Sequence, residues 1–325
     1  MRLPTTKHHA RHAKDDGELV IESELDVGLR FPGDVPGKMY VATWQGQHAV
    51  VTRSGDHLDI SVPAAEGVVV TGFDNESDVP HHVDTSLTFD KGQRQTTAPP
   101  ASPSTSRAMN PRASSLPQIT FWMFLHDDVL DVDRQHIHAR YVAWWIADLA
   151  KVLPSHRLWA IYSQQIAGVT DIPYGHTLAL QDWTDAIDSW NTRERTPRPS
   201  ATLDFKFMLI TRDRTAPGTS GQAWQGGEQA MASLNGRYSV IAHEFGHTLA
   251  AVHDDAEVRY ASGWPCETNM IPVTSVLRAN CYRYSAKNER NMRVHVAREW
   301  TIPSIPHLPD EPKYIIMDAK SPASD

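Results

Sequence analysis

The 325-residue chain is poor in cysteine, in long apolar runs and in positive charge. No apolar run approaches the roughly 20 residues that a membrane-spanning helix needs, so we expect no membrane span. The formal net charge of −8 argues against a general nucleic-acid binder, whose affinity would come from lysine and arginine neutralising phosphates. The first residues are basic, but no apolar segment follows them, so they do not predict a secretory signal peptide.

Only two cysteines are present, Cys266 and Cys281. They flank one short, loop-rich segment, which favours a disulfide over two reduced, buried thiols. A disulfide that closes a loop of about 15 residues would stabilise the fold by roughly 3 kcal/mol.

Composition divides the chain into five segments. Residues 1–16 are polar and predict a disordered tail. Residues 17–92 hold short runs rich in valine, isoleucine and aromatics, and predict a small all-β domain, a sandwich or barrel. Residues 93–117 are rich in proline, serine, threonine and alanine and predict a linker. Residues 118–300 form the larger domain, and residues 301–325, which contain five prolines, predict an extended C-terminal tail.

Strand and helix patterns alternate in the larger domain. Short apolar runs predict strands, and apolar residues at helical spacing predict helices. Asp133 stands where it can cap the first helix. The alternation predicts an α/β or α+β domain. In chain order the predicted elements are a strand over 118–126, a helix over 133–153, a strand over 157–166, a helix over 178–192, a strand over 204–213 and a helix over 236–252.

The last of these helices contains the sequence HEFGHTLAAVHDD, which starts at His243. His243 and His247 are four residues apart, so a helix places both imidazoles on one face, where they can share a metal ion. Glu244 points about 100° away from His243, near enough to contact a water beside the metal. This arrangement is what metal-assisted hydrolysis requires, because the carboxylate can take a proton from the water and pass it to the leaving group.

His253 would face away from His247 on a continuous helix, by about 240°. The third histidine can therefore join the other two only if the helix breaks after about Leu249 and the chain turns back. Glycine in the left-handed conformation is the natural residue for such a break, but this chain has Ala250.

The sequence HEFGHTLAAVHD resembles the metzincin zinc endopeptidases, whose motif is HExxHxxGxxH, and the following Asp254 is similar to the reprolysin (adamalysin-like) branch. The resemblance implies that His243, His247 and His253 bind one catalytic zinc ion and that Glu244 is the general base. Ala250 departs from the family's usual glycine, and a left-handed alanine costs roughly 1–2 kcal/mol. If the helix continued instead, a downstream carboxylate, Glu257 or Glu289, would be the third ligand.

The resemblance also implies an α+β, zincin-like catalytic domain with a mixed sheet and an active-site helix. It predicts a methionine turn beneath the metal, for which Met270 is the first candidate and Met292 the weaker one. The glycine-rich segment near 223–230 would be the edge strand that pairs with an extended peptide substrate. Tyr282 or Tyr284 is a candidate donor to the oxyanion of the reaction.

The N-terminal β-rich segment is predicted to be a pro-domain, a binding module or an export module. Because no cysteine precedes Cys266, it cannot inhibit the site through a cysteine. His81, His82 and Asp84 are the candidates for a competing metal ligand that would make the segment autoinhibitory.

The leading prediction is a zinc metalloendopeptidase acting on proteins or peptides, with no nucleic-acid partner. We expect an exported protease or toxin effector with an extracytoplasmic location, reached without a recognisable signal peptide or with a leader outside this sequence. One alternative is a zinc hydrolase with a His-His-carboxylate site that acts on a cell-wall peptide or small amide. The other is a binding protein whose zinc is structural.

Overall fold

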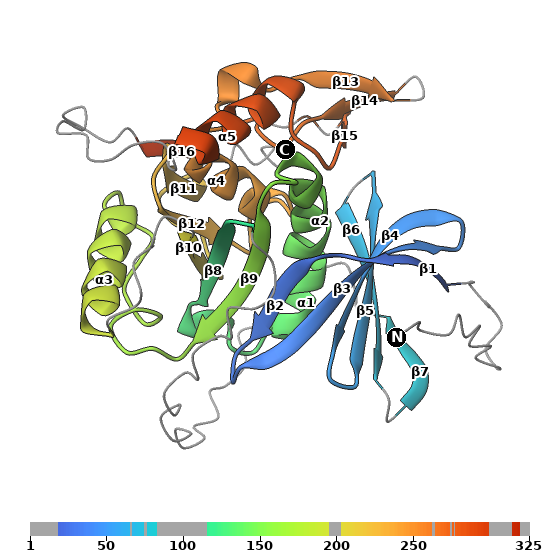
Figure 1. The fold of residues 1–325 in the computed structure, drawn as a ribbon. Coiled ribbons are helices and arrows are strands. Elements are labelled where there is room, and N and C mark those ends of the chain that lie inside the picture. Colours follow the sequence, from blue (N-terminus) through green and yellow to red (C-terminus); the bar gives the residue numbers. More distant parts are fainter. Residues whose placement is uncertain are drawn as a thin grey trace, which may run out of the picture.

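A large mixed sheet runs through the molecule, and a few helices pack on it, as the computed structural model in Figure 1 shows. The fold class is therefore α+β, in agreement with the prediction. The structure describes residues 19–65, 67–74, 77–82, 116–194, 203–261, 264–273, 275, 277–298 and 314–318.

The large sheet has 13 strands in the described part of the chain. They are β1 (Leu19–Glu24), β2 (Val27–Phe31), β3 (Val35–Trp44), β4 (Gln47–Ser54), β5 (His57–Ala64), β6 (Gly67–Asp74), β7 (Ser77–His82), β8 (Gln118–Leu125), β9 (Arg157–Gln164), β10 (Leu203–Thr211), β11 (Thr219–Trp224), β12 (Gln229–Ser233) and β16 (Tyr314–Asp318). Their order is β16-β11-β12-β10-β8-β9-β2-β3-β4-β5-β6-β7, and β1 pairs with β3. Strands β12, β10, β8, β9 and β2 are parallel neighbours, whereas β11 runs antiparallel to β12.

After β8, helices alternate with strands along the chain. A second, small sheet lies near the C-terminal helix (Figure 1). The helical elements are η1 (Asp127–Val129), α1 (Arg134–Ile137), the π-turn η2 (His138–Val142), α2 (Ala143–Val152), α3 (Ala179–Arg193), α4 (Val240–Thr248), η3 (His253–Asp255) and α5 (Ala286–Arg298). The small sheet consists of β13 (Val258–Ala261), β14 (Trp264–Glu267) and β15 (Ala279–Asn280). No helix in the described residues is long and apolar enough to cross a membrane.

Of the three hydrophobic clusters in the described residues, one lies in the N-terminal strands and the two larger ones lie on opposite faces of the sheet centre. Strand β8 contributes to both because successive side chains of a strand point to opposite faces. Phe121 faces α2 and α4, where it packs against Trp145 and Phe245. Phe124 faces α3, where it packs against Trp183. Helices therefore cover both sides of the sheet centre, and α4 is held on the side of α2 (Figure 1).

The predicted elements of the larger domain are largely confirmed. The strands over 118–126, 157–166 and 204–213 correspond to β8, β9 and β10, and the helix over 178–192 to α3. Asp133 caps α1 by accepting hydrogen bonds from the amides of Gln135 and His136. The helix expected over 236–252 is shorter, since α4 spans only Val240–Thr248.

The N-terminal segment consists of strands, as predicted, but it does not form its own sandwich or barrel. Strand β2 pairs in parallel with β9, so strands β2–β7 extend the sheet of the larger domain. Two side-chain contacts reinforce this junction, because Ser61 donates to the carbonyl of Ala139 and Tyr282 donates to the carbonyl of Ala64. The boundary proposed at 93–117 lies almost wholly outside the described residues, so the division into two domains stays a prediction. The tails at 1–16 and 301–325 also lie outside them, apart from β16.

Candidate metal centre

Two of the three predicted histidines lie one turn apart on α4. His243 and His247 are both fully buried, and their Nε2 atoms are 3.1 Å apart. The remaining nitrogen of each ring has a backbone acceptor. Nδ1 of His243 is 2.8 Å from the carbonyl oxygen of Asn269, and Nδ1 of His247 is 3.0 Å from that of Ala251.

Helix α4 ends at Thr248, just before the point at which the chain must turn for His253 to join the other two histidines. Ala250 has a φ of +65°, in the left-handed region. The amide of Ala251 donates to the carbonyl of Gly246, and the amide of Ala250 donates to that of His247. These two bonds form a Schellman motif, which satisfies carbonyl groups at the helix end. The predicted left-handed break is therefore confirmed, with alanine in the place where glycine is usual.

Because a left-handed alanine is strained, we expect Ala250→Gly to stabilise the protein by about 1 kcal/mol. Glycine relieves the backbone strain but makes the unfolded chain more flexible, so the gain is smaller than the full strain. Denaturant unfolding measures it. Ala251→Gly is the matched control and should destabilise, because buried Ala251 does not have a positive φ. A loss of stability in Ala250→Gly would contradict the strained cap.

The returning chain carries His253 in η3, and helix α5 holds it in place. The side-chain amide of Asn288 bonds both backbone groups of Val252, at 2.8 and 3.0 Å. Ser285 donates to the carbonyl of Asp255, and Asn291 donates to its carboxylate. The first turns of α5 thus fix the residues on either side of His253.

The three imidazoles converge at one point. Nε2 of His253 lies 2.8 Å from that of His243 and 3.1 Å from that of His247. Among the described residues, these three histidines form a group that could hold a metal ion.

The donor atoms of this group suit a cation. Since Nδ1 of His243 and of His247 each face a carbonyl oxygen, each ring carries its proton there and turns a lone pair of Nε2 toward the centre. Burial lowers the pKa of His243 well below its ordinary value and that of His247 to about 3, and it also lowers the pKa of His253. Lone pairs that face one another without protons repel, and a metal ion between them removes that repulsion. Zinc–nitrogen bonds of about 2.0–2.1 Å would separate such ligands by about 3.3 Å, a few tenths of an ångström more than here.

Glu244 lies beside this centre with its carboxyl group fully buried. Among the described residues, neither carboxyl oxygen has a hydrogen-bond partner. Burial raises the pKa of the carboxyl well above its ordinary value, although Arg237 opposes this effect. Strand β11 packs directly on the side chain, because a Cβ placed on Gly221 would lie 2.4 Å from Oε1 of Glu244. The carboxyl group of Glu244 is thus buried and unpartnered, one residue along α4 from His243.

Met270 packs against helix α4. It is fully buried, and a Cβ placed on Gly246 would lie 2.6 Å from its Sδ. The preceding residue, Asn269, supplies the carbonyl that accepts from His243. Met270 is therefore buried against α4 directly after a residue that contacts His243, and its role as a methionine turn stays a prediction. Met292, the weaker candidate, is buried on α5 within the core.

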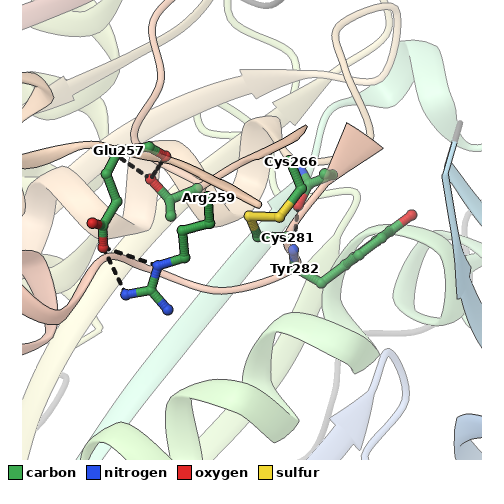
Figure 2. The surroundings of a disulfide bond; sticks show 7 residues. Glu257, Arg259, Cys266, Cys281 and Tyr282 are labelled. Carbon is green, nitrogen blue, oxygen red and sulfur yellow. Dashed lines mark hydrogen bonds and ion pairs between the residues drawn. A yellow bond between two sulfur atoms is a disulfide. The ribbon is translucent and has the colours of Figure 1, made fainter. Parts of the chain in front are cut away.

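The disulfide between Cys266 and Cys281 is confirmed, with a Cα–Cα distance of 5.0 Å. Figure 2 shows that it joins β14 to the chain just after β15, with Tyr282 extending away from it. The loop that it closes contains both Asn269 and Met270. The bond therefore limits the freedom of the segment that contacts His243 and supports α4.

The two candidate oxyanion donors, Tyr282 and Tyr284, use their hydroxyl groups in other hydrogen bonds. The hydroxyl of Tyr282 donates to backbone carbonyls of the β5–β6 turn, at Ala64 and Gly67. The hydroxyl of Tyr284 lies beneath α4, where it donates to the carbonyl of Ala242 and accepts from the indole of Trp145. Both hydroxyls are thus engaged in holding the fold together.

The alternative third ligands are not brought to the histidines. Glu257 forms an ion pair with Arg259, as Figure 2 shows. Glu289 lies between Arg283 and Arg293. Both carboxylates thus bind arginine. The helix break instead brings His253 to the other two histidines as the third possible metal ligand.

The edge strand is displaced from its predicted position. In the described part of the sheet the outermost strand on this side is β16, with β11 beside it, and the predicted segment 223–230 covers the end of β11, the following turn and the start of β12. The turn contacts the metal centre, because Oε1 of Gln225 lies 3.1 Å from Nδ1 of His247 and the amide of Gly226 donates to the carbonyl of His247. The outer edge of β11 is paired with β16, which the sequence did not predict.

The predicted competing ligands lie elsewhere in the sheet order. His81 and His82 belong to β7, at the end of the sheet opposite to β11 and β16. Their side chains and Asp84 lie outside the described residues. Autoinhibition by the N-terminal segment stays a prediction.

Several residues that shape the site were not predicted. Gly221 lies against Glu244, Gly246 against Met270, and Asn288 bonds the segment before His253. Gly246 is the one with a signal in the sequence, because glycine inside a helix is costly and indicates a close contact. Gly221 and Asn288 act across different elements, which spacing along the chain does not reveal.

The fold resembles that of a solved bacterial protease. No family model and no curated protein sequence matches the chain. Among solved structures, metalloproteinase-II from Bacteroides fragilis matches with a TM-score of 0.53 and 12% sequence identity, over 84% of this chain and 86% of that chain. Residues 118–325 make up less than 84% of this chain. The similarity in fold therefore extends into the N-terminal strands.

Proposed function

We propose that the protein is a zinc-dependent endopeptidase. The observation that carries the proposal is the convergence of three imidazole Nε2 atoms within 3.1 Å, with a buried, unpartnered Glu244 on the same helix. The fold shared with metalloproteinase-II from Bacteroides fragilis supports it. Zinc is the proposed metal because three histidines with an open fourth position are a typical catalytic zinc set.

In this proposal each residue near the centre has one task. His243, His247 and His253 hold the zinc ion, which supplies Lewis-acid chemistry toward a water and a peptide carbonyl. Glu244 accepts a proton from the attacking water at its carboxylate and then delivers it to the leaving amine. Asn269 and Ala251 accept hydrogen bonds from the two helical imidazoles and thereby fix which nitrogen carries the proton.

The substrate in this proposal is an extended peptide that pairs with the outer edge of β11. This edge is paired with β16 in the structure, so a substrate would replace that strand, and it runs beside Glu244 and beside the turn that contacts His247. A strand added to such an edge gains main-chain hydrogen bonds without regard to sequence. The proposal thus favours unfolded or flexible protein segments over folded ones.

A structural role for the metal is less well supported. A closed structural zinc site needs a fourth protein ligand, and the group found in the described residues has three members. A His-His-carboxylate site is also disfavoured, because both candidate carboxylates bind arginine instead. An oxidising, extracytoplasmic setting remains part of the proposal, since disulfides such as Cys266–Cys281 persist there.

Cleavage of an unfolded protein such as reduced casein tests the proposed function. We expect cleavage to stop when a chelator removes the metal and to return on addition of stoichiometric zinc, because the three histidines alone cannot polarise a carbonyl. Fragment analysis by mass spectrometry measures it. The function would be wrong if the zinc-loaded protein cleaved no member of a diverse peptide library, or if cleavage persisted in the metal-free protein.

A further inference from the structure

The C-terminal strand β16 occupies the outer edge of β11. It pairs antiparallel with that strand, and Figure 1 labels it beside β11. The paired positions are Trp224 with Tyr314, Ala223 with Ile315, Gln222 with Ile316, Gly221 with Met317 and Thr219 with Asp318.

This edge is the one that borders the metal centre. Gly221, which is paired with Met317, lies against the carboxylate of Glu244. Just beyond Trp224, which is paired with Tyr314, Gln225 and Gly226 contact His247. β16 therefore runs beside the stretch of β11 that extends from the general base to a metal-binding histidine.

An edge strand can form a backbone ladder with one partner at a time on its outer side. We propose that β16 is a reversible, intramolecular competitor that holds the place of a peptide substrate on β11. The inference rests on the proposed function, because it assigns the same edge to substrate. The segment Tyr-Ile-Ile-Met-Asp is mostly apolar, so the peptides that displace it best are extended and apolar.

The expected strength of this competition depends on the length of chain that tethers β16 to α5. Residues 299–313 join α5 to β16. A tether of about 15 residues typically gives an effective concentration in the millimolar range. If the free segment binds the edge with a dissociation constant of about 10–100 μM, the attached strand lowers the apparent affinity for other peptides about 10- to 100-fold.

Substitution with proline in the full-length chain tests the inference. Proline lacks the amide hydrogen that a ladder needs. Because alternate residues of an antiparallel strand turn their amides toward the partner, Ile315→Pro and Ile316→Pro are made separately, with Ile316→Val as the matched control. All three carry Glu244→Gln, so that a bound peptide is not cut. The probe is a fluorescein-labelled peptide with the sequence of residues 312–320, and fluorescence anisotropy measures its binding.

We expect at least one proline variant to bind the probe ten times more tightly or better, and the valine variant to bind like the parent. With Glu244 restored, the same proline variant should show a lower KM for a peptide substrate and an unchanged kcat. The free peptide should inhibit that cleavage competitively. Equal probe binding by the parent and both proline variants, with unfolding curves unchanged, would overturn the inference.

These outcomes separate the inference from the proposed function. Tighter probe binding in a protein that cleaves nothing would support competition at the edge and contradict the peptidase. Cleavage by a protein in which the proline substitutions change neither probe binding nor KM would support the peptidase and contradict competition by β16.

Discussion

Glu244→Gln is expected to lower kcat on the order of 10³-fold, about 4 kcal/mol of transition-state stabilisation, while zinc stays bound. Glutamine keeps the shape of the side chain but cannot accept the proton of the attacking water. The carboxyl group is fully buried and has no hydrogen-bond partner among the described residues. A neutral amide at this position should therefore not destabilise the fold through a lost ion pair.

Three measurements on the same preparation make this result interpretable. They are the initial rate on a quenched fluorescent peptide, the zinc content and the unfolding midpoint. Glu257→Gln is the matched control, because Glu257 binds Arg259 at the surface and should leave the rate unchanged. Full activity in Glu244→Gln would show that Glu244 is not the general base. Loss of zinc together with activity would show that it helps to hold the metal.

Gly221→Ala is expected to lower kcat about 10²-fold, because the new methyl group would occupy the position of the Glu244 side chain. The added Cβ would lie 2.4 Å from Oε1, 2.6 Å from Cγ and 2.7 Å from Cδ of Glu244. The carboxyl group must then move, and a shift of about 1 Å in a catalytic group costs about this factor. Zinc content should not change, because the three atoms nearest to the added methyl group all belong to Glu244.

Gly72→Ala provides the matched control for this strand substitution. The glycine lies in β6, and a Cβ there would lie 3.3 Å from Oδ1 of Asp59, which would have to shift by only a few tenths of an ångström. We expect normal turnover in Gly72→Ala. If Gly221→Ala were fully active, the contact between β11 and Glu244 would have no role in positioning the carboxylate. If Gly221→Ala lost zinc, the substitution would disturb the metal-binding histidines as well as Glu244.

Much of the site could be predicted because its residues are close together in the sequence. The helical spacing of His243 and His247 determines that they share a face, and the angle to His253 requires the break that the structure shows at Ala250. The central strands were predictable because each is a continuous apolar run between turn residues. Asp133 was recognisable as a cap because a cap acts within its own helix.

The parts that could not be predicted depend on contacts between distant segments. The parallel pairing of β2 with β9 joins the N-terminal strands to the larger domain, and nothing in either strand specifies that partner. Helix α5 is so polar that its apolar stripe gives little signal, yet its Asn288 fixes the chain before His253. The proline-rich C-terminal tail gave no indication that residues 314–318 pair with β11.

The most direct test of the account is the zinc content of the purified protein, measured by elemental analysis beside His253→Ala and Glu289→Ala. We expect about one zinc ion per chain in the parent and in Glu289→Ala, and loss of most of it in His253→Ala, because His253 is the residue that converges with the two helical histidines in the part of the chain that the structure describes. Retention of zinc by His253→Ala with loss from Glu289→Ala would contradict the site built on three histidines.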